Sequence, residues 1–131
     1  MPKEQNMEKV IKIKIDSFEL GAILNNSRTA EAIWEALPIV ARANTWGDEI
    51  YFSIPVHLEL ENGQELVEKG DLCYWPTGNA FCIFFGPTPL SRGTEIRPAS
   101  AVTIFGKVVG DAIGLKSVRT GAEVNVERKA E

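Results

Sequence analysis

The sequence predicts a mainly β protein, a barrel or a sandwich, with one short α-helix. Apolar and polar residues alternate with a period of two through most of the chain, which is typical of half-buried strands. Turn-forming Gly, Pro, Asn and Asp residues separate these short runs. The chain has 131 residues, enough for one domain, and many short strands within one such unit favour a barrel or a sandwich.

The first two predicted strands are residues 10–15 and 18–24. In the first, Ile11, Ile13 and Ile15 share one face while lysines occupy the other, so one face is expected to be buried. Asp16 and Ser17 lie between the two strands and are expected to form a turn.

The period changes in the next segment, where four apolar residues form one helical stripe: Ala30, Ile33, Trp34 and Leu37. Asn26 or Ser27 can cap the start of this helix by accepting a backbone N–H bond. Pro38 ends it, because a proline ring clashes with the preceding helical turn.

After Pro38 the period returns to two. Residues 45–48 are expected to form a turn, and residues 86–100 an irregular loop. Residues 110–121 fit no single structure. The remaining predicted strands are residues 39–43, 49–54, 56–60, 72–75, 80–85, 101–109 and 123–127.

The composition excludes several classes of protein. Apolar residues make up 44% of the chain and charged residues 24%, as in soluble globular proteins. The formal net charge is −4 and no basic block occurs, which disfavours binding to nucleic acid. No run of about 18 apolar residues is present, so no membrane span is expected. Residues 1–9 are polar and lack the apolar core of a secretory signal, so we expect a cytoplasmic protein.

Metal-ligating and nucleotide-binding motifs are missing as well. One histidine, His57, and two cysteines are too few for a structural zinc site. No glycine-rich phosphate-binding motif occurs, so we expect neither a metal nor a nucleotide cofactor. The alternation of residues 56–60 places His57 opposite Val56 and Leu58, which favours a solvent-facing strand histidine over a catalytic one.

Residues 70–89 contain a dense run of aromatic residues on two adjacent strands. A hairpin centred on Thr77 and Gly78 places Cys73 directly opposite Cys82. Opposed residues in such a pair lie within the range of a disulfide bond. Two free, buried thiols are the expectation in a reducing cytoplasm, with a disulfide as the alternative.

Both faces of this hairpin are apolar, so both must be covered. One face carries Cys73, Trp75, Ala80, Cys82 and Phe84, and the other carries Leu72, Tyr74, Phe81, Ile83 and Phe85. One of them is expected to fill a barrel. The other is expected to meet the helix, a terminal segment, a ligand or a second subunit, so a homodimer is one alternative. Tyr74, Trp75 and Phe85 lie near strand ends and are the better candidates for a cleft.

Four segments resemble the cyclophilin-like family of small bacterial and archaeal proteins of uncharacterised function: residues 29–38, 46–52, 70–76 and 84–89. This resemblance implies a closed eight-stranded barrel of cyclophilin-like topology. The barrel domain is expected to span residues 10–127, with a polar N-terminal extension at residues 1–9 and a C-terminal tail at residues 128–131.

We interpret the aromatic residues as the walls of a cleft that binds a small ligand or a proline-containing peptide. Polar groups near the rings are expected to orient the ligand. The predicted binding residues are Trp46, Glu49, Tyr51, Tyr74, Trp75, Phe85, Thr88 and Arg92.

Two enzymatic alternatives remain open, and no catalytic residue is assigned. The fold analogy suggests a peptidyl-prolyl cis-trans isomerase, with Arg42 or Arg92 as a donor to the twisted amide. However, the Phe-His-Arg, Gln-Gly-Gly-Asp and Asn-Gly-Ser-Gln-Phe-Phe stretches of true cyclophilins are absent. A hydrolase using Asp48, Glu49 or Asp71 is the other alternative, although the two aspartates each follow a glycine, as turn residues often do.

Overall fold

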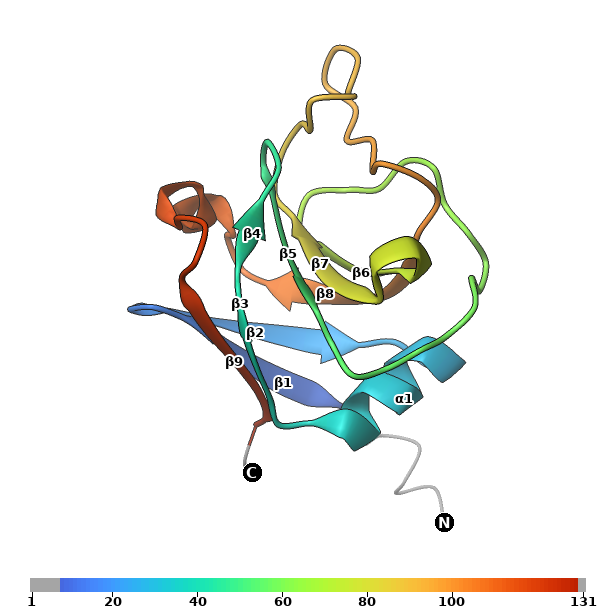
Figure 1. Cartoon of the computed structure of the whole chain (residues 1–131), viewed down its shortest axis with the longest axis vertical. Coiled ribbons are helices and arrows are strands. Elements are labelled where there is room, and N and C mark those ends of the chain that lie inside the picture. The colour runs from blue at the N-terminus through green and yellow to red at the C-terminus, as the bar shows by residue number, and fades with distance from the viewer. Residues whose placement is uncertain (1–7, 130–131) are drawn as a thin grey trace.

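The computed structural model describes residues 8–129, which form a β-barrel with one α-helix (Figure 1). Residues 1–7 of the predicted extension and residues 130–131 of the predicted tail lie outside the described residues. The strands are β1 (Val10–Ile15), β2 (Phe18–Leu24), β3 (Ile39–Arg42), β4 (Asn44–Thr45), β5 (Glu49–Ser53), β6 (Asp71–Trp75), β7 (Ala80–Phe84), β8 (Thr103–Val109) and β9 (Glu123–Arg128). The helix is α1 (Arg28–Ala36), and two short 3-10 helices are η2 (Pro76–Gly78) and η3 (Ile113–Ser117).

The first hairpin follows directly from its alternating sequence. β1 pairs antiparallel with β2 along its whole length, and with β9 on its other side. Ile11, Ile13 and Ile15 are fully buried, so the isoleucine face points into the barrel as predicted. Asp16 takes a positive φ of 52° in the connecting turn, a conformation that aspartate tolerates better than most residues.

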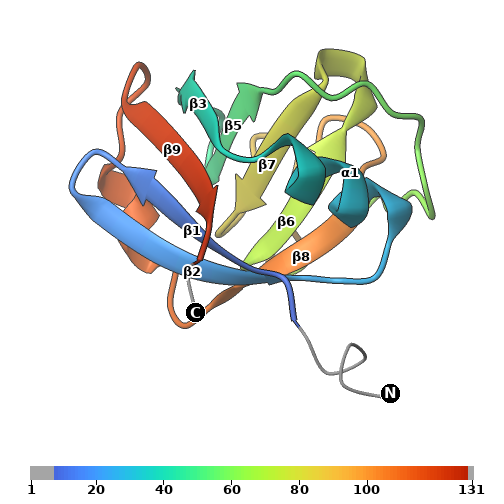
Figure 2. The same cartoon turned by 90° about the horizontal axis from the view of Figure 1, so that it is seen from below.

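The sheet closes on itself through one bent segment. The strands follow the order β3-β9-β1-β2-β8-β6-β7-β5-β4, so β3 and β4 stand at opposite ends of the sheet. These two strands are neighbours in the chain, separated only by Ala43. The chain itself therefore joins the two edges, and the barrel is nearly closed (Figure 2). The mainly β barrel is confirmed, with nine strands where the family resemblance implies eight. Of the strands predicted by residue range, 56–60 is absent, and β4 is an addition that follows β3 after a break at Ala43.

The helix starts and ends where the sequence predicts. Ser27 is the N-cap, and its Oγ accepts a hydrogen bond from the Ala30 N–H at 3.0 Å. The helix ends at Ala36, two residues before Pro38, and its buried side packs into the barrel core. Within residues 8–129, no helix has the length and apolar character needed to cross a bilayer.

The two faces of the β6–β7 hairpin belong to different apolar clusters. Leu72, Tyr74, Phe81 and Ile83 point into the barrel interior, whereas Cys73, Ala80, Cys82 and Phe84 form a second cluster on the outside. The outer cluster is covered by Val67, Ile96 and Val102, which lie in or next to two long connections, residues 54–70 and 85–102. The apolar outer face therefore has a cover within the chain, and the homodimer stays a prediction.

The prediction of a strand at residues 56–60 is wrong. Residues 54–60 run without regular secondary structure, and His57 lies exposed in this loop. The loop is held by the Tyr74 hydroxyl, which donates to the Val56 carbonyl at 2.6 Å and accepts from the Leu58 N–H at 3.2 Å. The Tyr74 side chain thus anchors the middle of this segment, and no strand among residues 8–129 pairs with residues 55–60.

Candidate functional site

The strand register brings the central residues of the site together on the outer face of the barrel. β5 pairs with β7 so that Glu49 faces Phe84 and Tyr51 faces Cys82. β6 pairs with the other edge of β7, with Trp75 opposite Ala80. Side chains of directly paired residues lie on the same face of a sheet. Glu49, Tyr51, Phe84 and Trp75 therefore share the outer face of three adjacent strands.

A tight turn adds Trp46 to this face. The Trp46 N–H donates to the Glu49 carbonyl at 3.0 Å, and the Asp48 N–H donates to the Pro87 carbonyl at 3.0 Å. Gly47 has a φ of +59°, and an added Cβ there would lie 2.8 Å from the Pro89 side chain. The turn thus needs glycine both for its left-handed backbone and for its close approach to the following loop.

A cleft opens between this face and the loop before β8. Its volume is about 220 Å³. Aromatic and aliphatic groups form most of its wall, and Glu49 supplies a carboxyl group. We call it the aromatic cleft, and its lining residues are Trp46, Glu49, Tyr51, Trp75, Phe84, Pro98, Ala99 and Val102. The indole N–H of Trp75 donates to the Ser100 Oγ at 2.7 Å, which ties one wall to the loop.

Glu49 is the unusual ionisable group of the aromatic cleft. Only 6% of its surface is exposed, although it lies in a cleft with apolar walls. Burial raises its pKa from 4.5 to about 7, because the charged form loses its hydration, and the neighbouring Cys82 thiol opposes part of this rise. Near neutral pH this carboxyl therefore exists in both its protonated and its ionised forms.

The two cysteines lie behind the aromatic cleft as free, buried thiols, in the predicted cross-strand pair. Burial raises the pKa of both thiols well above the usual value, and the nearby Glu49 carboxylate adds to the effect. Thiols in such surroundings stay protonated at neutral pH and are poor nucleophiles. The cysteines therefore contribute packing beside the cleft.

Four of the eight predicted binding residues line the aromatic cleft: Trp46, Glu49, Tyr51 and Trp75. Tyr74 and Phe85 do not reach it. Both belong to the barrel core, where Tyr74 is fully buried and Phe85 is 4% exposed. Their side chains alternate away from Trp75 and Phe84, so their position near strand ends does not place them beside the cleft.

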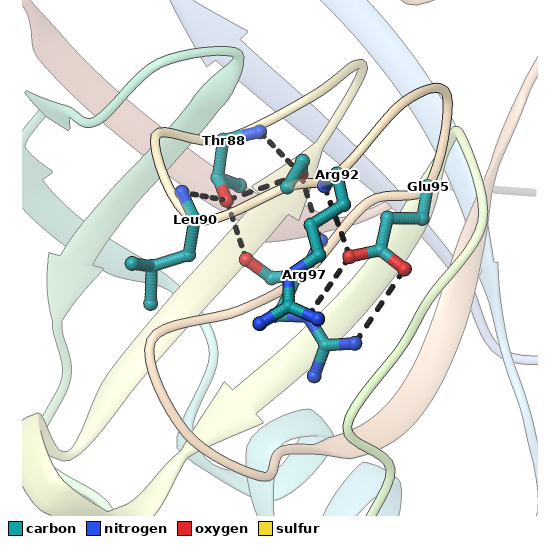
Figure 3. Close-up of polar contacts among 6 residues, drawn as sticks. Thr88, Leu90, Arg92, Glu95 and Arg97 are labelled. Carbon is teal, nitrogen blue, oxygen red and sulfur yellow. Dashed lines mark hydrogen bonds and ion pairs between the residues drawn. The ribbon is translucent and has the colours of Figure 1, made fainter.

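Thr88 and Arg92 lie in the loop that follows β7 (Figure 3), and neither residue lines the aromatic cleft. The Thr88 hydroxyl donates to the Arg97 carbonyl and accepts from the Leu90 N–H. Glu95 accepts from the Arg92 backbone N–H at 3.0 Å and from the Arg97 Nε at 2.9 Å. These bonds hold the shape of the loop. Thr88 thus supports the loop whose residues Pro98 and Ala99 form one wall of the cleft, and does not itself contact the cleft.

Four lining residues were not predicted. Phe84 shares an alternating face with Cys82 and Trp75, which the sequence shows, but the pairing of β7 with β5 that brings it opposite Glu49 comes from the structure. Pro98, Ala99 and Val102 come from the connection that precedes β8. Their position depends on the path of a long connection, for which the sequence carries no periodic signal.

The other candidate groups lie outside the aromatic cleft. Asp48 pairs with Lys116 at 2.8 Å, and Asp71 pairs with Lys107 at 3.3 Å. The Arg42 guanidinium donates to the Gly121 carbonyl at 3.0 Å. Glu49 is thus the one lining residue among the carboxylates proposed for a hydrolase. In the part of the chain that the structure describes, no group of three or more His, Cys, Asp or Glu residues could hold a metal ion.

Comparisons with known proteins agree with this architecture. A family model described as Cyclophilin-like matches residues 9–127. The solution structure of a hypothetical protein from Archaeoglobus fulgidus is similar, with a TM-score of 0.82 and 45% sequence identity over 97% of this chain and 99% of that chain. No curated protein matches this chain. The family match covers most of the barrel, and the chain therefore belongs to the cyclophilin-like family.

Proposed function

We propose that the protein binds a small organic ligand, or the proline ring of a peptide, in the aromatic cleft. Ligand sites are typically concave and mostly apolar, with a small number of polar groups that fix orientation. The aromatic cleft has this character, since rings form its walls and Glu49 provides one carboxyl group.

The observation that carries this proposal is the open, aromatic-walled cavity itself. Protein interiors are close-packed, and cavities larger than a water molecule are few. The aromatic cleft, at about 220 Å³, lies outside the buried barrel core and has room for several water molecules. An apolar ligand would displace this water from apolar walls, which is favourable.

The isomerase alternative stays a prediction. Stabilising a twisted prolyl amide needs a donor in the cleft, and neither Arg42 nor Arg92 lines it. We therefore place binding before catalysis. The cytoplasmic location likewise remains an expectation from the sequence.

A thermal-shift experiment tests the proposal with two probes, the branched alcohol 3,3-dimethylbutanol and a proline-containing tetrapeptide. At least one probe is expected to raise the melting temperature of the wild type in proportion to the logarithm of its concentration. Ala99→Phe is designed to fill the aromatic cleft from an exposed position, and should abolish this rise. Thr94→Phe, exposed on the same loop and outside the cleft, is the matched control and should retain it.

Two results would count against binding in the aromatic cleft. One is a wild-type melting temperature that neither probe changes, and the other is an equal rise in Ala99→Phe. The tetrapeptide also serves in a cis-to-trans relaxation assay. Acceleration that disappears in Ala99→Phe would promote the isomerase alternative over simple binding.

A further inference from the structure

We propose that the natural ligand of the aromatic cleft is an organic cation, a small molecule carrying an alkylated ammonium group. This inference rests on the proposed function and names the chemical class of its ligand. Two features of the cleft support it, the aromatic wall and a buried carboxyl group that has no cationic partner among the described residues.

The aromatic wall comes from several parts of the fold. Trp46 lies in the turn before β5, Tyr51 in β5, Trp75 at the end of β6 and Phe84 at the end of β7. The face of an aromatic ring carries negative electrostatic potential, which attracts a cation, and indole does so most strongly. Several rings around one small cavity are the arrangement that recognises alkylated ammonium groups.

The carboxyl group of Glu49 has no cationic partner. Only 6% of the surface of Glu49 is exposed. No Lys, Arg or His side chain of residues 8–129 forms an ion pair with its carboxyl group. Lys107 of β8 pairs with Asp71, and Lys116 of η3 pairs with Asp48, the residue next to Glu49 in the chain. A buried carboxylate without a counter-charge is costly. A cation in the aromatic cleft would supply that charge.

The ionisable groups on the neighbouring strands β6 and β7 supply no counter-charge to Glu49. Cys82 of β7 and Cys73 of β6 are thiols whose pKa values are raised by burial, so they remain neutral. Asp71 of β6 is held by Lys107 of β8. A cation can bind next to Glu49 only after this carboxyl has lost its proton, so binding is expected to release a proton and to strengthen as pH rises.

Calorimetric titration with two molecules of the same shape tests the charge directly. Choline and 3,3-dimethylbutanol differ only in a quaternary nitrogen that replaces a quaternary carbon. At about pH 8, choline is expected to bind the wild type roughly 30-fold more tightly, which corresponds to about 2 kcal/mol for a desolvated cation between rings. From about pH 6 to about pH 8 its affinity should rise about tenfold, because the ionised fraction of a group with a pKa of about 7 rises by that factor.

Glu49→Gln separates the charge from the shape of the site. This variant should lose the pH dependence of choline binding and bind choline at about pH 8 more weakly than the wild type does, because only the attraction of the rings remains. Its affinity for 3,3-dimethylbutanol should stay near the wild-type value. Glu59→Gln, in the exposed loop, is the matched control and should behave as the wild type.

The outcomes separate the two proposals. Equal or weaker binding of choline than of 3,3-dimethylbutanol would overturn the cation inference and leave the proposed function standing. Choline binding that Glu49→Gln leaves unchanged in affinity and in pH dependence would also overturn it, since Glu49 would then supply no charge to the ligand. Failure of both molecules and of the tetrapeptide to bind the wild type would overturn the proposed function together with the inference.

Discussion

Replacing Glu49 with glutamine is expected to stabilise the folded protein at neutral and alkaline pH. The folded-state pKa of about 7 lies above the value of 4.5 expected for an exposed carboxyl. Between these two values the unfolded chain has released this proton and the folded chain retains it, so the free energy of unfolding falls as pH rises. At about 1.4 kcal/mol per pH unit, the total loss is about 3 kcal/mol, complete above the folded-state pKa.

Glutamine cannot ionise, so Glu49→Gln should not suffer this loss. The difference in unfolding free energy between variant and wild type should therefore grow by about 3 kcal/mol from about pH 4 to about pH 8. At the higher pH this corresponds to a rise in melting temperature of about 10 °C for a domain of this size. Other carboxyls also make the unfolding free energy depend on pH. Hydrogen bonds from Thr29 lower the pKa of Glu61, for example, so its contribution has the opposite sign. Such contributions are the same in variant and wild type, and they cancel in the difference between the two unfolding free energies.

Urea unfolding at several pH values, followed by circular dichroism, measures this difference. Glu59→Gln removes an exposed carboxyl and should give a difference that stays near zero at every pH. The reasoning would be refuted if Glu49→Gln showed a constant difference across the range, because Glu49 would then have the same pKa in both states. A difference that changed in the opposite direction would show that the folded protein favours the ionised carboxyl.

Three further predictions concern the framework around the aromatic cleft. Tyr74→Phe removes the hydroxyl that anchors the loop 54–60 and should lower the free energy of unfolding by about 1–3 kcal/mol, measured by urea unfolding; an unchanged value would show that the anchor is dispensable. Gly93 has a φ of +62° and open space around it, so Gly93→Ala should lower the free energy of unfolding only by the backbone strain, about 1 kcal/mol. Gly47→Ala should lower it by about 1–3 kcal/mol more, because the added Cβ meets the neighbouring loop. Equal losses in thermal unfolding would contradict this clash. Cys73 and Cys82 should resist an aromatic disulfide reagent in the native protein and react fully in denaturant, and rapid native reaction would contradict their burial.

Local sequence patterns predict most of the fold because they report which side of each strand is buried. The isoleucine alternation of β1 and the cap at Ser27 appear in the structure as expected. The pairing of Cys73 with Cys82 also follows, because a short hairpin fixes its own register. The segment 56–60 shows the limit of this reasoning. It alternates as a strand does, yet its backbone bonds to a tyrosine hydroxyl from a distant part of the chain.

The candidate site was predicted in part for the same reason. Glu49 and Tyr51 alternate with the buried residues of β5, so they share the outer face on which Trp75 also lies. Its position near a strand end predicts Tyr74 in the cleft, but the alternation places it on the face opposite Trp75, and in the structure that face fills the barrel interior. The position of the loop around Pro98 depends on contacts between residues that are far apart in the sequence. The local alternation of apolar and polar residues contains no information about such contacts.

The central claim is that a small cationic ligand enters the aromatic cleft, and the three tryptophans of the chain test it directly. Each indole N–H gives its own resonance in a two-dimensional proton–nitrogen NMR spectrum. Trp46 and Trp75 line the cleft, whereas Trp34 lies on α1 with the Arg128 guanidinium 4.6 Å from its ring. Addition of choline is predicted to shift the signals of Trp46 and Trp75 and to leave that of Trp34 in place. Three unmoved signals, or a shift of Trp34 as large as the others, would contradict the claim.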